Sequence, residues 1–264
     1  MASCLLWRGI SRCRCSGSRL LLTSSRKGVQ INPQTLARVT GVLFVITFAT
    51  SIPPFVYHYA PVLDDPRYIV GGGGADNRVL TGAFLELLLI ISNIGTALVL
   101  WPVLKRVNEI LALGYVTARV VECVFIAVGI LSVLTVVTLR QEAAAGADAG
   151  TLLTTGQSLV ALKDWTFLLG PGFFGVVGTG LMLGYLMYTS RLVPRPLALL
   201  GLIGGPLIIA SGVGVMFGVI EAGGGWQLIA TIPEALWELF VLGIWLIVRG
   251  FNPSALSRLE DEPQ

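Results

Sequence analysis

The sequence predicts an all-α, polytopic integral membrane protein, built as a bundle of six transmembrane helices. Hydrophobic residues make up 54% of the 264 residues and charged residues only 12%, whereas soluble domains carry about 25% charged residues. Mainly apolar runs of roughly 20 residues or more, long enough to cross a hydrocarbon core of about 30 Å as a helix, occur six times. The expected spans are residues 36–57, 79–104, 111–139, 165–188, 197–220 and 226–248.

Proline, glycine and small residues mark the ends and faces of these spans. Pro53 and Pro54 disturb the end of the first span, and the glycine run at residues 71–74 in the next loop is typical of a flexible linker. Residues 140–164, between the third and fourth spans, are rich in Ala, Gly and Thr, so we expect an exposed loop with room for a short surface helix. Pro233 is expected to kink the sixth span. Two small-residue patterns, at residues 180–184 and 214–218, favour close helix packing in the fourth and fifth spans.

The third span contains two charges well inside its apolar run, Arg119 and Glu122. A charge at this depth costs several kcal/mol unless it faces the bundle interior and finds a partner. Residues three apart share one face of a helix. We therefore expect both side chains to point away from lipid.

Further polar residues lie on single faces of other spans. Asn93 follows Glu86 by seven residues in the second span, and Glu238 follows Glu234 by four in the sixth. The candidate intramembrane polar network is therefore Glu86, Asn93, Arg119, Glu122, Glu234 and Glu238. If these strips converge, four carboxylates share one guanidinium. They cannot all be ionised in a low dielectric, so we expect at least one Glu to carry a proton.

Three kinds of function fit this pattern. We favour a non-catalytic membrane subunit or scaffold, in which the polar groups bond across helices and fix the packing. The alternative is a small proton-linked transporter that uses the intramembrane carboxylates. A membrane-embedded enzyme is third, because no histidine lies in a span to activate a nucleophile; the single histidine is His58.

The sequence predicts no catalytic, metal-binding or cofactor-binding residues. The stretch GPGFFG at residues 170–175 matches G-x-G-x-x-G, but it opens an apolar helix and does not follow a strand, so a dinucleotide site is rejected. One histidine and four scattered cysteines do not form a zinc site. We expect the lipid bilayer as partner and no nucleic acid. The sequence is compatible with a homo-oligomer and leaves the ligand, small molecule or ion, open.

The charge distribution predicts the orientation. Residues 1–35 form a basic extension with six basic residues and no acid, consistent with a cytoplasmic tail, a mis-called start or a transit peptide. With residues 36–253 as the membrane domain and 254–264 as a cytoplasmic tail, the side that holds the termini has 13 Lys and Arg. The opposite side has four, Arg67, Arg78, Arg140 and Lys163. The positive-inside rule then places both termini in the cytoplasm of a multi-pass cell-membrane protein.

Four stretches carry a family resemblance: ARVTGVLF (37–44), LALGYVTARVVE (111–122), LGYLMYTSRLVPR (183–195) and PEALWELFVLGIWLIVRGF (233–251). From about Leu36 to Pro253 the chain resembles a family of six-helix bacterial membrane proteins, domain of unknown function 4386. In that family an acid after the Arg of the third span recurs, as does a Pro-Glu pair with a second Glu in the sixth. The matching residues here are Glu122, Pro233, Glu234 and Glu238. The resemblance implies the fold and a bacterial membrane and adds no chemistry. The extension before about Ile31 departs from it, which favours a mis-called start.

Overall fold

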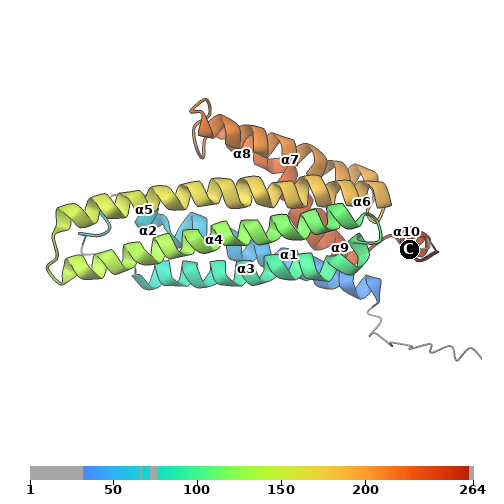
Figure 1. Cartoon of the computed structure of the whole chain (residues 1–264), viewed down its shortest axis with the longest axis horizontal. Coiled ribbons are helices and arrows are strands. Elements are labelled where there is room, and N and C mark those ends of the chain that lie inside the picture. The colour runs from blue at the N-terminus through green and yellow to red at the C-terminus, as the bar shows by residue number, and fades with distance from the viewer. Residues whose placement is uncertain (1–31, 66, 72–75, 262–264) are drawn as a thin grey trace, which may run out of the picture. The chain divides into compact units, whose positions relative to one another are not determined.

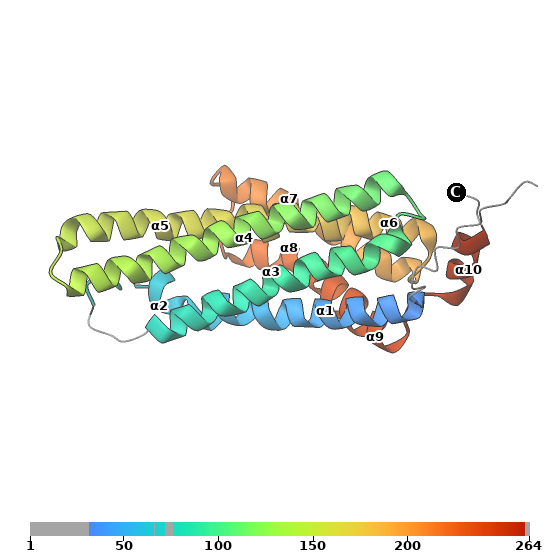
Figure 2. The ribbon, with the colours of Figure 1, turned by 60° about the horizontal axis from the view of Figure 1, so that its bottom comes forward.

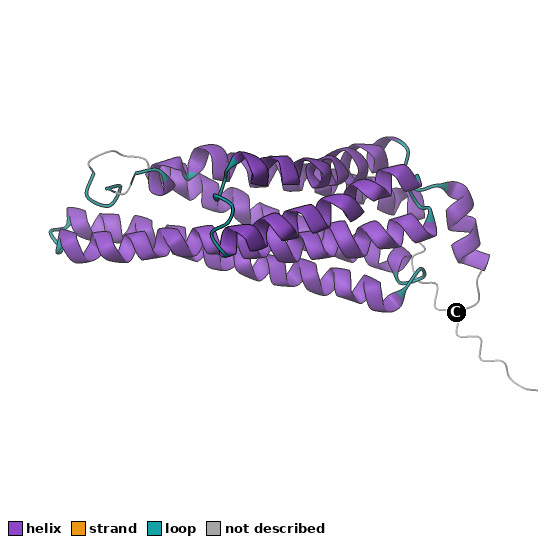
Figure 3. Ribbon diagram, turned by 90° about the horizontal axis from the view of Figure 1, so that it is seen from above, coloured by secondary structure: helices purple, strands orange, loops and turns teal. Residues whose placement is uncertain are grey.

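A computed structural model describes residues 32–65, 67–71 and 76–261, with the side chains of residues 260 and 261 left out. Most of the predicted extension and the last residues of the tail lie outside this range. The described residues form helices and turns and contain no strand (Figures 1 and 3). The elements are α1 (Pro33–Pro53), η1 (Pro54–His58), α2 (Ala60–Leu63), α3 (Asp76–Leu104), α4 (Glu109–Ala144), α5 (Ala149–Leu169), η2 (Gly170–Gly175), η3 (Val177–Leu183), α6 (Gly184–Ser190), α7 (Arg195–Met216), α8 (Gly225–Ala235), η4 (Leu236–Trp245), α9 (Leu246–Val248) and α10 (Pro253–Asp261); η marks π-helix.

Six of the resulting helices are long and apolar enough to cross a membrane. They are Pro33–His58, Asp76–Leu104, Glu109–Ala144, Ala149–Ser190, Arg195–Met216 and Gly225–Val248. Large apolar side chains such as Ile91, Leu98 and Leu131 are more than 60% exposed on their outer faces. Such surfaces suit lipid, because a soluble protein rarely exposes large apolar patches. The predicted bundle of six transmembrane helices is confirmed.

The fourth long helix differs from the prediction. It begins at Ala149, not near residue 165, and α4 continues to Ala144, so residues 140–164 are almost entirely helical. Asp148 starts the helix, because its carboxylate accepts a hydrogen bond from Thr151 N (2.9 Å). The cap and the packing of α5 along α4 therefore outweigh the composition, rich in Ala, Gly and Thr, that suggested a loop.

Side-chain caps also set the starts of α1 and α4. Asn32 accepts from Gln34 N (2.9 Å) and precedes Pro33, a residue suited to the first helical position. Asn108 accepts from Leu111 N (2.9 Å). Each cap satisfies a backbone donor that the helix itself leaves free.

Within residues 32–261, α4 packs along both α3 and α5, α1 packs against α3 and η4, and α7 packs against α8 and η3. Figure 2 shows α10 and the start of α1 at the same end of the bundle, and α2 with the α4–α5 turn at the other. A large apolar cluster, which includes Phe44, Leu104 and Trp237, fills the α10 end. A second cluster around Tyr59 and Val136 fills the α2 end, and a small one around Leu89 and Ile126 lies on α3 and α4.

Candidate functional site

A buried ion pair joins α3 to α5. Lys163 Nζ donates to Glu86 Oε1 (2.7 Å) and Oε2 (2.9 Å), and the Tyr59 hydroxyl donates to Oε2 (2.8 Å). Lys163 and Glu86 are 4% and 7% exposed. The carboxylate is thus satisfied by three donor contacts, as an ionised group out of water requires.

The predicted pair on α4 forms a second buried cluster. Arg119 Nη1 donates to Glu122 Oε2 (2.7 Å), and Nη2 donates to Asn93 Oδ1 (2.5 Å). Asn93 Nδ2 in turn donates to Glu122 Oε1 (3.1 Å), which closes a ring of three side chains. Thr47 of α1 lies 3.4 Å from the Asn93 oxygen, so the cluster links α1, α3 and α4.

Glu234 of α8 forms a third buried polar site, between η3 and α7. It is 3% exposed, and its Oε1 lies 3.1 Å from Thr179 Oγ1. Its Oε2 is buried without a hydrogen-bond partner among the described residues. A Cβ placed on Gly180 or Gly204 would come within 2.8 Å or 2.9 Å of Oε2, so glycines make the room for this carboxyl group.

Glu238 lies one helical turn after Glu234 and is half-buried. It lies within electrostatic range of Arg119 and of Glu234. Among the described residues, the ion pairs that the structure records join Arg119 to Glu122, Lys163 to Glu86 and Arg140 to Asp76. Glu234 and Glu238 belong to none of these recorded ion pairs.

The backbone around Glu234 and Glu122 departs from the α-helix. Glu234 follows Pro233 and precedes η4, while Thr179 and Gly180 lie in η3. Gly175 ends η2 against the Glu122 carboxyl, where a Cβ would come within 2.8 Å of the carboxyl carbon. π-helical turns are rare in proteins and are frequent at functional sites.

A further polar cluster lies near the α2 end. The Tyr68 hydroxyl donates to Asp76 Oδ1 (2.8 Å), and Arg140 pairs with the same oxygen. Burial raises the pKa of the Tyr68 phenol, which therefore keeps its proton and acts as the donor.

The predicted network is thus divided. Asn93, Arg119 and Glu122 are bonded to one another, Glu238 and Glu234 lie within electrostatic range of Arg119, and Glu86 bonds instead to Lys163 and Tyr59. The expected interior of four carboxylates and one guanidinium needs a correction, because Lys163 is a second buried cation. Sequence reasoning placed Lys163 on the outer side, since it precedes the expected fourth span.

A family model described as domain of unknown function (DUF4386) matches residues 39–250. The chain belongs to this family. No curated protein and no solved structure matches it. The DUF4386 match begins within the first membrane-spanning helix, covers the other five and includes Arg119, Glu122, Glu234 and Glu238. Membership of DUF4386 agrees with the resemblance found in the sequence and assigns no activity.

Proposed function

We propose that this DUF4386 protein is a small proton-linked membrane transporter in which Glu234 binds the proton. One contact carries the proposal. Thr179 Oγ1 lies within hydrogen-bond distance of two oxygens, the Gly175 carbonyl (2.9 Å) and Glu234 Oε1 (3.1 Å). A threonine hydroxyl has a single proton to donate, so an ionised Glu234 would compete with the carbonyl for it.

A protonated Glu234 removes this competition. Its own hydroxyl donates to Thr179 Oγ1, and Thr179 then donates to the Gly175 carbonyl. The second carboxyl oxygen has no hydrogen-bond partner among the described residues, and burying it in this way costs far less in a neutral acid than in an anion. Glu238, half-buried on the same face, supplies a site from which the proton can be exchanged.

The surrounding backbone supports a site that changes conformation. The glycines of η3 and α7 keep the helices close to Glu234, and η3 and η4 lie on either side of it. π-helical turns inside α-helices are frequent at functional sites. Loss of the proton would leave a buried anion and so favour an arrangement that exposes Glu234.

A non-catalytic scaffold is the second candidate. Its support is the pairing of Arg119 with Glu122 and Asn93 and of Lys163 with Glu86, which fixes helices α1, α3, α4 and α5 against one another. These bonds serve packing in either function. Glu234 separates the two candidates, because a scaffold gains nothing from a buried carboxyl group with an unused oxygen.

We also propose that the protein lies in a bacterial cell membrane and that both ends of its membrane domain face the cytoplasm. The α10 end of the bundle has the basic residues Arg38, Lys105, Arg106, Arg191, Arg195, Arg249 and Arg258. Because Lys163 is buried, it no longer counts as a cation on the opposite side. The excess of Lys and Arg at the α10 end, on which the positive-inside rule acts, therefore becomes larger.

Transport is tested with the full-length protein in liposomes that contain a pH-sensitive dye. Panels of small ions and metabolites are added outside, and a solute that moves with protons changes the internal pH. At least one solute should give a pH change that is lost in Glu234→Gln and kept in Arg249→Gln, a change at an exposed position. If none changes the internal pH in the wild-type protein, the scaffold becomes the better account.

A further inference from the structure

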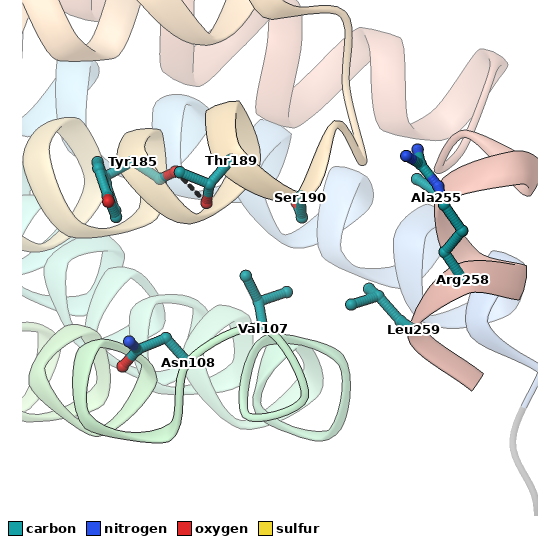
Figure 4. Close-up of a pocket in the computed structure, with 8 residues that line it drawn as sticks. All are labelled: Val107, Asn108, Tyr185, Thr189, Ser190, Ala255, Arg258 and Leu259. Carbon is teal, nitrogen blue, oxygen red and sulfur yellow. Dashed lines mark hydrogen bonds between the residues drawn. The ribbon is translucent and has the colours of Figure 1, made fainter. Parts of the chain in front are cut away.

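A cavity of about 350 Å³ lies at the α10 end of the bundle, away from the carboxylates. Figure 4 shows its three walls: α6, the turn between α3 and α4, and α10. Asn108 directly precedes α4 and Ser190 ends α6, so the cavity lies at the ends of two membrane-spanning helices. The ends of such helices lie in the headgroup region of a bilayer.

The lining of the cavity is amphipathic. Asn108, Thr189, Ser190 and Arg258 contribute polar groups, and Val107 and Leu259 contribute apolar ones. Polar groups at a membrane surface can bind a headgroup, while apolar groups beside them suit the start of an acyl chain. A lining of both kinds is therefore suited to a lipid.

The charge at this end of the bundle is positive. Between residues 32 and 261, basic residues in its helix ends and turns outnumber acidic ones by seven to three, with Glu109, Glu260 and Asp261 as the acids. Arg258 lines the cavity, and its Nε donates to the Ser254 carbonyl one turn earlier in α10 (3.0 Å). No carboxylate among the described side chains pairs with Arg258. An anion is the complementary ligand.

We propose that this cavity binds the headgroup of an anionic phospholipid, with Arg258 on the phosphate and Asn108, Thr189 and Ser190 around the remaining oxygens. Basic pockets between transmembrane helices commonly bind anionic headgroups. α10 forms one wall of the cavity and packs on the bundle through Ala255, Leu256 and Leu259, so the lipid also fastens this helix to the bundle. The site is independent of Glu234 and of proton transport.

The test measures lipids that remain bound to the full-length protein. The protein is released from nanodiscs that contain phosphatidylglycerol and phosphatidylcholine in equal amounts. Native mass spectrometry then measures the mass of the protein together with any lipid that it retains. The wild-type protein should keep one phosphatidylglycerol, and glycerol 1-phosphate in excess, which has the headgroup phosphate but no acyl chains, should not displace it. Arg258→Gln should lower the occupancy about fivefold, the effect of losing one cationic contact with an anionic headgroup.

Two further variants make the result specific. Thr189→Trp fills the cavity without changing charge and should abolish the retained lipid, whereas Arg249→Gln removes an exposed cation at the same end, outside the lining, and should have no effect. Because Arg258 is exposed, we expect Arg258→Gln to fold. This variant decides the test if Thr189→Trp does not fold. Equal retention in wild type and Arg258→Gln, equal retention of phosphatidylcholine, or displacement by glycerol 1-phosphate would each overturn the proposal.

Discussion

Lys163 on α5 and Glu86 on α3, 77 residues apart in the chain, form a buried ion pair with 2.7 Å between Nζ and Oε1. The pair joins two of the long helices at one level of the bundle. The Tyr59 hydroxyl completes it, so α3, α5 and the end of η1 meet at one carboxylate.

Replacement of Lys163 by Met should therefore destabilise the protein. It leaves the Glu86 carboxylate buried with Tyr59 as its remaining donor, and loss of one partner of a buried pair typically costs about 3–5 kcal/mol. The double variant Lys163→Met/Glu86→Gln should be milder than Lys163→Met, because it removes the uncompensated charge. Thermal unfolding in detergent measures both, with Lys105→Met at an exposed position as the control. A Lys163→Met protein as stable as this control would contradict the assigned role.

The Arg119–Glu122 pair should show the same behaviour on α4. Glu122→Gln leaves the guanidinium, 2% exposed, without its carboxylate, and a loss of about 3–5 kcal/mol is expected. Arg119→Gln with Glu122→Gln should be milder than either change alone, since two amides can bond to each other and to Asn93. Unfolding of the three variants forms a double-mutant cycle. If the stability losses of the two single variants sum to the loss of the double variant, Arg119 and Glu122 are not coupled.

Two glycines that enclose Glu234 should differ in their tolerance of a methyl group. At Gly204 an added Cβ would lie 2.6 Å from the backbone N of Glu234, whereas at Gly180 the nearest atom is the carboxyl Oε2, at 2.8 Å. The end of a side chain can move and a helix backbone cannot, so Gly204→Ala should cost more, on the order of 1–3 kcal/mol for overpacking. Gly225→Ala, with nothing within 4 Å, is the matched control. Equal melting temperatures for Gly204→Ala and Gly225→Ala would refute the close contact.

Orientation is tested by thiol labelling of intact cells in a background without native cysteine. Ala145→Cys, in the exposed turn after α4, should react with an impermeant reagent, and Ser254→Cys, at the start of α10, should not. The reason is the excess of Lys and Arg at the α10 end. Gly73, which precedes α3 in the chain, should label like Ala145 but lies outside the described residues. Labelling at Ser254 with protection at Ala145 would reverse the orientation.

Much of this arrangement is readable from local sequence. The six spans follow from long, mainly apolar runs, and the Arg119–Glu122 contact follows from a spacing of three on a helix. The pairing of Glu86 with Lys163 and Tyr59 was missed, because helix contacts between distant parts of a chain leave no periodic signal. Lys163 carried one clue: a lone cation two residues before Trp165, close to an apolar run.

The irregular turns were also beyond sequence reasoning. Glycine and proline near residues 170–184 and 233–243 indicate irregularity, but they do not specify π-helical turns. The unpartnered oxygen of Glu234 depends on how η3, α7 and α8 pack, which sequence periodicity leaves open.

The proton on Glu234 is measured most directly by infrared difference spectroscopy of the purified protein in nanodiscs at neutral pH. The wild-type protein should show the carbonyl stretch of a protonated carboxylic acid. Glu234→Gln should lose this band, and Glu109→Gln, at an exposed carboxylate, should keep it. Glu234→Gln should also unfold at nearly the wild-type temperature, because its amide can donate to Thr179 Oγ1 as the protonated acid does. A wild-type spectrum without the band, or the same band in Glu234→Gln, would contradict a proton-binding site at Glu234.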